Sequence, residues 1–296
     1  MQEKIGMRPF SRIHTWTDAD YKSWLLSEMK LSQKGILIMQ KWVRFGGIWL
    51  LMIMLWQGCA ASKPQHDVKN IAGEYQKGLD FMAKKNWIKS EETFTFIVYN
   101  DPAGEYADDA QYSLAETWYF REEYLIAIDE YDRLIQRMPN SPLIPQASWR
   151  KAECYYLLSP DYRLDQTLSE RALKELQNFV DIFPQDENRI QAAKYIVEIR
   201  SKLAHKLYGS GVLYLKLREW DSAKLYFDVV LENYYDTEYL ENALMGKAEA
   251  LVGENKADEA ESLLAQINPG ELDNDQKKQL ARVNAELTKL RKQPTD

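Results

Sequence analysis

The residues that could do covalent or metal chemistry are few. The chain has two cysteines, Cys59 and Cys154, and three widely separated histidines, His14, His66 and His205. It contains no metal-binding spacing of histidines, no Gly-rich phosphate loop and no G-x-S-x-G nucleophile motif. Pairs of Asp and Glu are so frequent that solvated helix faces explain them better than acid–base catalysis. Cys154 has no second cysteine near it in the sequence, which favours a small buried side chain over a redox role. We therefore predict a protein that is not an enzyme and that uses no metal and no cofactor.

Cys59 directly follows a short apolar segment. This segment ends at Trp56 and is at most about 14 residues long, whereas a helix that crosses a bilayer needs roughly 20. Extending it backwards would bury Lys41 and Arg44, at about 3 kcal/mol each. A basic pair, a short apolar core and the small residue Gly58 are instead the three parts of an export signal.

The cysteine at the end of this signal resembles the lipobox of bacterial lipoproteins. In that motif the cysteine thiol is alkylated with diacylglycerol, and cleavage before the cysteine exposes an acylated N-terminus. We predict cleavage between Gly58 and Cys59 and an anchor of three acyl chains, because a single chain binds a membrane only marginally. The residue after the cysteine is Ala60 and not Asp. In lipoproteins that this motif resembles, a residue other than Asp at this position implies sorting to the outer membrane, here to its inner leaflet. The alternatives for residues 43–62 are an uncleaved anchor and a buried hydrophobic helix.

The signal also divides the first part of the chain. A signal peptide that starts at Met39 covers residues 39–58, and residues 59–70 form a lipidated tether. Residues 1–38 are then an extension that is disordered or that precedes the true start, so the sequence leaves Met1 and Met39 open as starting residues.

The charge of the mature chain restricts its partners. Removing residues 1–58 takes away 8 Lys and Arg and 4 Asp and Glu, which leaves 30 basic against 41 acidic residues over 238 positions. A net charge of −11 argues against binding nucleic acid, whose phosphates attract basic proteins.

Apolar residues recur at helical spacing through residues 70–290, and strand patterns are scarce. Three phrases repeat an aromatic residue, a small residue three positions later and an aromatic residue four positions after that: Trp87, Ser90 and Phe94; Tyr124, Ala127 and Tyr131; Trp220, Ala223 and Phe227. This is the spacing of the second helix of a tetratricopeptide repeat. Five pairs of a small residue and a bulky residue three positions later predict the first helices: Gly78 and Phe81, Ala115 and Trp118, Ala152 and Tyr155, Gly211 and Tyr214, Ala248 and Leu251.

Stacked helix pairs bury the apolar face that no pair can bury alone. We therefore predict an all-α, right-handed solenoid of five tetratricopeptide-type helix pairs with a C-terminal capping helix in residues 271–292. Repeats 1–3 occupy residues 71–187. Residues 188–296 hold a linking helix to about residue 208, repeats 4–5 and the cap, and an insertion lies in the third repeat.

A lipoprotein signal followed by five such pairs resembles the BamD family, the lipoproteins of the outer-membrane β-barrel assembly machine. The most specific stretch is RSKLAHKLYGSGVLYLKLREWDSA, residues 200–223. The resemblance implies an outer-membrane protein assembly factor, lipid-anchored and facing the periplasm. It implies that the C-terminal repeats bind the barrel-forming subunit BamA and that the N-terminal repeats receive unfolded outer-membrane proteins. Two alternatives remain: a periplasmic tetratricopeptide adaptor for cell division or peptidoglycan synthesis, and a cell-wall hydrolase, for which no residues are left to build a catalytic domain.

Two surfaces follow from these expectations. Arg200 and Lys202 are the candidate contacts to the barrel-forming partner, with a solvated helix face as the alternative. The candidate peptide-binding groove is a line of exposed side chains on the first helices of repeats 1–3: Tyr75, Leu79 and Met82; Tyr112, Glu116 and Tyr119; Trp149, Glu153 and Tyr156. The alternative is that these rings pack repeat against repeat.

Overall fold

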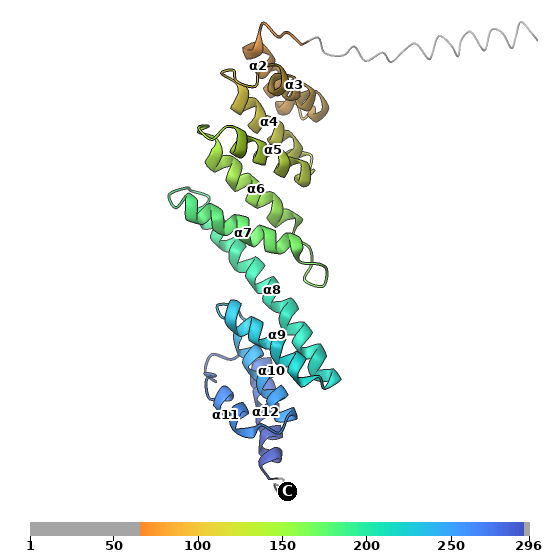
Figure 1. The fold of residues 1–296 in the computed structure, drawn as a ribbon, viewed down its shortest axis with the longest axis vertical. Helices are drawn as coiled ribbons and strands as arrows, with labels where there is room; N and C mark the ends of the chain where they lie inside the picture. The colour runs from red at the N-terminus through yellow and green to blue at the C-terminus, as the bar shows by residue number, and fades with distance from the viewer. Residues whose placement is uncertain (1–65, 293–296) are drawn as a thin grey trace, which may run out of the picture. The chain divides into compact units, whose positions relative to one another are not determined.

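The computed structural model describes residues 66–292. In this part of the chain the backbone forms eleven α-helices and no strand (Figure 1). They are α2 (Ile71–Ala83), α3 (Trp87–Asn100), α4 (Ala107–Phe120), α5 (Tyr124–Arg137), α6 (Ile144–Leu158), α7 (Thr167–Ile182), α8 (Arg189–Leu217), α9 (Trp220–Asn233), α10 (Leu240–Gly253), α11 (Ala257–Leu264) and α12 (Asn274–Arg291). The predicted all-α fold is confirmed. The predicted signal peptide, Gly58 and Cys59 lie outside the described residues.

Consecutive helices pack as pairs, and each pair packs on the next. The pairs are α2–α3, α4–α5, α6–α7, α8–α9 and α10–α11, and α12 packs on both helices of the last pair. The small residues of the repeated phrases lie inside the stack, since Ser90, Ala127 and Ala223 are fully buried. The predicted five tetratricopeptide-type pairs with a capping helix are therefore present.

Glycine on a first helix makes room for an aromatic ring of the second helix. A Cβ atom on Gly78 would lie 2.6 Å from the ring of Phe94, and one on Gly211 would lie 2.5 Å from the ring of Phe227. These separations are shorter than carbon atoms tolerate, so a methyl group at either glycine would force the ring to move away from the helix backbone. The spacing of small and large residues is thus a packing requirement.

Four of the five pairs use the same tight turn between their helices. One residue at the C-terminal end of each first helix has a positive φ, either the first or the second residue after the helix: 54° at Lys85, 63° at Glu122, 61° at Arg218 and 64° at Asn255. The next backbone N–H donates to the carbonyl of the bulky residue of the first-helix pattern, namely Phe81, Trp118, Tyr214 and Leu251, at 2.8–3.1 Å. This is the Schellman arrangement, which satisfies carbonyls that a helix end leaves free. The third pair lacks it and has residues 159–166 between its helices instead.

The predicted linking helix and the first helix of the fourth pair form one continuous helix, α8, of 29 residues. Its N-terminal part contributes Ala192 to the core around Trp149 and Phe179, and its C-terminal part contributes Leu215 to the core around Phe227. One helix therefore joins the third and fourth pairs.

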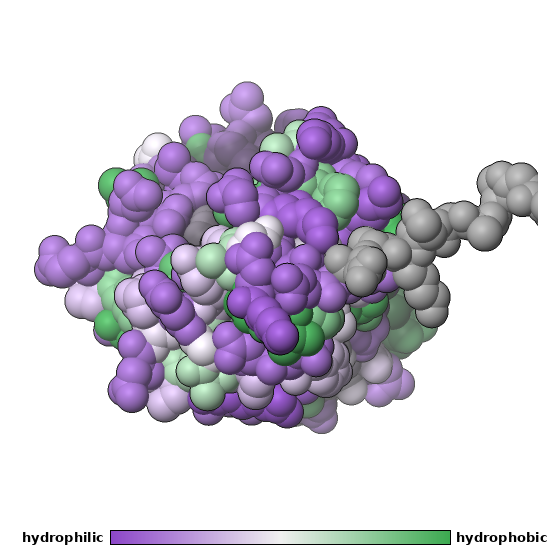
Figure 2. Space-filling view, turned by 90° about the horizontal axis from the view of Figure 1, so that it is seen from above, coloured by the Kyte–Doolittle hydropathy of each residue, from purple (hydrophilic) through white to green (hydrophobic). Residues whose placement is uncertain are grey.

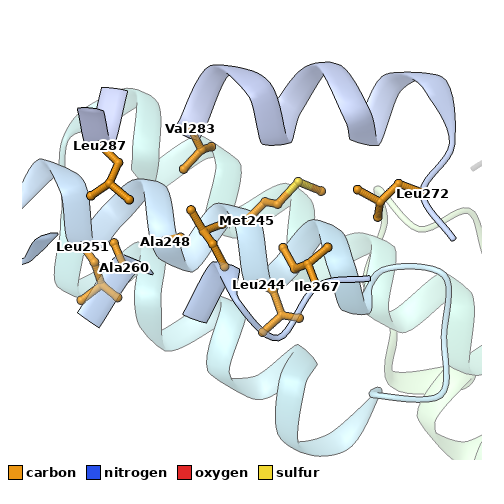
Figure 3. Packing of buried hydrophobic residues seen from close by; sticks show 10 residues of the cluster. Leu244, Met245, Ala248, Leu251, Ala260, Ile267, Leu272, Val283 and Leu287 are labelled. Carbon is orange, nitrogen blue, oxygen red and sulfur yellow. The ribbon is translucent and has the colours of Figure 1, made fainter. Parts of the chain in front are cut away.

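The capping helix α12 covers the apolar face of the last pair. Asp273 and Gln276 form a capping box at its start. Val283 and Leu287 pack against α10 residues Met245 and Ala248 (Figure 3). The cap gives the end of the stack a polar outer surface.

The described surface is mostly hydrophilic, with separate apolar patches, on the face that Figure 2 shows. Among residues 66–292, no helix has both the length and the apolar character needed to cross a membrane.

Candidate protein-binding sites

The first three side chains of the predicted groove lie on α2. Tyr75, Leu79 and Met82 are half-buried and pack against the core of the first pair. The Tyr75 ring lies 5.8 Å from that of Phe94 and 5.3 Å from that of Tyr106. These residues are partly available to a ligand, and their buried edges hold the first pair together.

On α4, Tyr112 and Tyr119 are half-buried, but Glu116 is only 9% exposed. The prediction that Glu116 is exposed is wrong. Its carboxylate accepts a hydrogen bond from the hydroxyl of Tyr131, which is fully buried on α5 and has no access to water. A buried hydroxyl needs such an acceptor, which fixes Glu116 inside the second pair.

On α6 the expected exposure of Trp149 is also wrong, because this side chain is 7% exposed. Its ring lies 5.6 Å from Phe179 of α7 and 6.0 Å from Tyr195 of α8. Tyr195 also stacks on Tyr156, with ring centroids 3.6 Å apart. The N-terminal extension of α8 therefore covers the side chains that the repeat pattern alone leaves open.

Arg150 connects the second and third parts of the groove. Its Nε lies 3.1 Å from Glu116, its Nη1 donates to Glu153 at 2.7 Å, and its guanidinium lies 4.6 Å from the centre of the Tyr119 ring. Burial, and then the charge of Glu116, raise the pKa of Tyr112 to about 12. Burial lowers the pKa of Arg150, but its two carboxylate partners outweigh that effect, so the guanidinium keeps its charge. The cation and both carboxylates are thus already paired, and the tyrosine rings remain the contact surface.

Arg200 and Lys202 line a pocket of about 520 Å³ beside α8. Its walls are α8, Tyr162 of the insertion in the third repeat, and the segment between α9 and α10 that includes Asp236 and Tyr239. The structure thus brings the two predicted residues to one site, together with segments that are distant in the sequence.

The two cations have different surroundings. The Arg200 side chain is 16% exposed and is paired within the protein, since its Nε donates to Asp236 at 2.9 Å and its Nη2 donates to the carbonyl of Asn233 at 2.7 Å. Lys202 donates to the hydroxyl of Ser159 at 2.7 Å and forms no ion pair within residues 66–292. Burial lowers the pKa of Lys202, and Asp161 and Glu198 only partly offset this. Lys202 is therefore the residue whose charge a partner carboxylate could still neutralise.

Sequence reasoning missed the aromatic part of this pocket. His205 lies between Tyr162 and Tyr239, with ring centroids 3.8 Å and 5.0 Å away. The only sequence feature that points to this aromatic part is the long insertion before α7, because it contains Tyr162. Elsewhere in residues 66–292, no group of three His, Cys, Asp or Glu side chains could hold a metal ion. Cys154 is fully buried, as predicted, and burial raises its thiol pKa well above the usual range.

Comparison with known families places this architecture. Residues 68–264, about two thirds of the chain, match the model of the YfiO family, described as outer membrane lipoprotein. The chain belongs to the YfiO family. The match includes both groove and pocket residues and ends at the last residue of α11, before α12.

Two curated relatives carry the name outer membrane protein assembly factor BamD. The protein of Rickettsia prowazekii is 28% identical over 204 residues, which cover 69% of this chain and 81% of the relative. The protein of Caulobacter vibrioides is 28% identical over 197 residues, which cover 65% of each chain. The predicted resemblance to the BamD family is confirmed.

Solved structures of tetratricopeptide repeat proteins are also similar. A protein from Parabacteroides merdae is 18% identical, with a TM-score of 0.33, over 77% of this chain and 82% of its own length. One from Bacteroides fragilis is 14% identical, with a TM-score of 0.35, over 76% of this chain and 88% of its own.

Proposed function

We propose that this protein is an outer-membrane protein assembly factor, a non-catalytic scaffold anchored through lipid on Cys59 and facing the periplasm. Membership of the YfiO family and the names of the curated relatives support this role. In the proposed arrangement the C-terminal repeats hold a BamA-like barrel-assembly protein, and the N-terminal repeats receive unfolded outer-membrane proteins.

The observation that carries the proposal is the position of Lys202. Lys202 forms no ion pair within the described residues, although Glu198 and Glu238 also line its pocket, and its half-buried ammonium suits an acidic side chain from a partner protein. Arg200 has a different part: its bonds to Asp236 and Asn233 hold the segment before α10 against α8 and so shape the pocket. Charge complementarity of this kind sets the register of a complex and its association rate.

Affinity purification from detergent-solubilised membranes tests this role. We expect the wild-type chain to recover a barrel-forming outer-membrane protein and Lys202→Glu to lose most of it. Lys194→Glu is the matched control, because Lys194 is exposed on the same helix and does not line the pocket. Equal recovery by both variants would contradict the docking role of Lys202. Recovery of cell-wall enzymes in place of the barrel protein would favour an adaptor for peptidoglycan synthesis.

The proposed anchor needs a separate test, since Cys59 lies outside the described residues. Mass spectrometry of the N-terminal peptide should find diacylglycerol and a third acyl chain on Cys59. Cys59→Ser should leave the signal uncleaved and the protein mislocalised. An unmodified peptide that contains Lys41 and Cys59 in the mature protein would overturn the anchor without affecting the docking proposal.

A further inference from the structure

A second concave site lies at the C-terminal end of the stack, between α8 and α12. Two adjoining cavities of about 430 and 390 Å³ share Leu215 and Glu249 in their linings. One wall comes from α8, the opposite wall from α12, and α10 contributes the residues between them. Together the two cavities form what we name the α8–α12 groove. It shares no lining residue with the pocket of Lys202.

The charged residues of the α8–α12 groove are mainly basic. Its lining includes the four cations Lys216, Lys278, Arg282 and Lys289, and the two anions Glu249 and Glu286. This excess of positive charge contrasts with the net charge of −7 of the whole chain. The groove therefore has a net positive charge, whereas the chain as a whole has a net negative charge.

Two of these four cations form ion pairs with carboxylates of the protein, and the other two do not. Arg282 lies 2.7 Å from Glu249, and Lys278 lies 2.7 Å from Asp275. Lys216 and Lys289 are exposed and form no ion pair within residues 66–292. These two lysines lie in different cavities, Lys216 beside the shared Leu215 and Lys289 in the cavity near the C-terminal end of α12.

Apolar side chains lie between the charges. Val212 and Leu215 line the groove from α8, Val252 from α10 and Leu290 from α12. The groove extends over the α12 residues Lys278 to Leu290, and at 1.5 Å per helical residue that corresponds to about 18 Å. An extended segment of about five or six residues has this length.

We propose that the α8–α12 groove binds an extended acidic segment of a partner protein. Carboxylates of the segment lie on Lys216 and Lys289, and its alternate apolar side chains lie against Leu215, Val252 and Leu290. Alternating acidic and apolar residues suit an extended strand, in which successive side chains point to opposite sides. This site goes beyond the proposed assembly role and is independent of the pocket at Lys202.

Fluorescence anisotropy with the full-length chain in detergent tests the site. The probe is a fluorescein-labelled seven-residue peptide of alternating Asp and Leu, compared with peptides of alternating Lys and Leu and of alternating Asp and Ser. We expect the Asp–Leu peptide alone to bind, with weaker binding as salt is raised. In the double variant Lys216→Glu, Lys289→Glu we expect the Kd to rise at least tenfold.

The matched control is Lys174→Glu, Lys277→Glu, which changes the net charge equally at two exposed lysines outside the groove. It should bind the Asp–Leu peptide as wild type does, and so should Lys202→Glu. Absence of binding to wild type, equal weakening in the control, or equal binding of the Asp–Ser peptide would overturn the proposal. Sedimentation that shows a dimer of the unliganded chain, abolished by the groove variant, would assign the groove to a second copy and would also overturn it.

Discussion

Gly209 and Gly211 lie two residues apart on α8 and have opposite surroundings. No atom lies within 4 Å of the place where a Cβ on Gly209 would be, whereas a Cβ on Gly211 would meet the ring of Phe227 at 2.5 Å. Packing against Phe227 therefore requires a small residue at position 211, whereas nothing around position 209 requires glycine.

Alanine at these two positions should have opposite effects on stability. Gly209→Ala should raise the free energy of unfolding by about 0.5–1 kcal/mol, because alanine loses less backbone entropy in a helix than glycine. Gly211→Ala should lower it by about 1–3 kcal/mol, because an added methyl group forces the Phe227 ring to move. Equilibrium urea unfolding measures both, and a change of the same sign in the two variants would contradict the packing argument.

Substitutions of Tyr119 and Trp149 distinguish residues of the predicted groove that contact a ligand from those that pack in the core. Trp149 is packed against Phe179 and Tyr195, so Trp149→Ala should lower stability by about 3–5 kcal/mol. Tyr119 is half-buried beside Arg150, so Tyr119→Ala should keep most of the stability and weaken binding of an extended peptide that ends in an aromatic residue. Peptide fluorescence and thermal melting measure the two effects. Wild-type peptide affinity in Tyr119→Ala would assign this ring to the core as well.

At the scale of the helices, the four Schellman turns place residues other than glycine at positive φ. Glu122 has a φ of 63°, and the N–H of Glu123 donates to Trp118 at 3.1 Å. A residue with a Cβ atom costs about 1–2 kcal/mol in this conformation, and glycine avoids that cost.

We therefore expect Glu122→Gly to raise the free energy of unfolding by up to about 1 kcal/mol. Glu123→Gly is the control, because it adds the same flexibility to the unfolded chain at a position with φ of −86°. It should lower stability. Equal destabilisation by both variants in urea unfolding would show that the turn stores no strain at Glu122.

The helix pairs could be predicted from the sequence because each depends on a local rule. A small residue and a bulky one at fixed spacing, as in Ala115 and Trp118, identify where two helices cross. The burial of Glu116 could not be predicted in this way, because it depends on the hydroxyl of Tyr131 in the facing helix. The burial of Trp149 could not be predicted either, because shifting a pattern by one repeat assumes that every repeat has the same neighbours. Trp149 instead meets Tyr195, which lies on the extended part of α8.

The pockets were beyond prediction for a related reason. The pocket of Lys202 combines α8 with Tyr162 and Tyr239, which come from two segments that no local pattern links. The α8–α12 groove likewise depends on how the capping helix lies against the last pair. The sequence identified Arg200 and Lys202 through a family resemblance and through the basic residues around them on an otherwise acidic chain. The structure then shows that Arg200 is paired with Asp236 and that Lys202 forms no ion pair within residues 66–292.

At the scale of the whole described molecule, α8 is the element that couples the two ends. Its residues belong to the core of the third pair and to that of the fourth, so unfolding of either core disturbs the other. In stacked repeats the free energy of unfolding is the sum of the stabilities of the single repeats and of the interfaces between neighbours. A helix shared by two pairs makes the contribution of their interface large.

A proline in the middle of α8 should uncouple the two halves. Gly209→Pro removes a helical hydrogen bond and costs about 3 kcal/mol or more, whereas Gly209→Ala leaves the helix intact. Hydrogen exchange at increasing urea should show α2–α7 and α9–α12 losing protection together in wild type and in Gly209→Ala, and separately in Gly209→Pro. Simultaneous loss of protection in the proline variant would contradict the coupling role of α8.

The turn that recurs in four of the five pairs also bears on how the length of this chain can change over evolution. A duplicated or deleted unit of the 37-residue period keeps every closing hydrogen bond only if both of its ends fall at equivalent turns, as at Phe81 and Trp118 or at Tyr214 and Leu251. The third pair offers no such end, because residues 159–166 replace its turn and α8 runs without a break into the fourth pair. Units can therefore be gained or lost on either side of the third pair, while the third pair itself has to be inherited as one piece with α8.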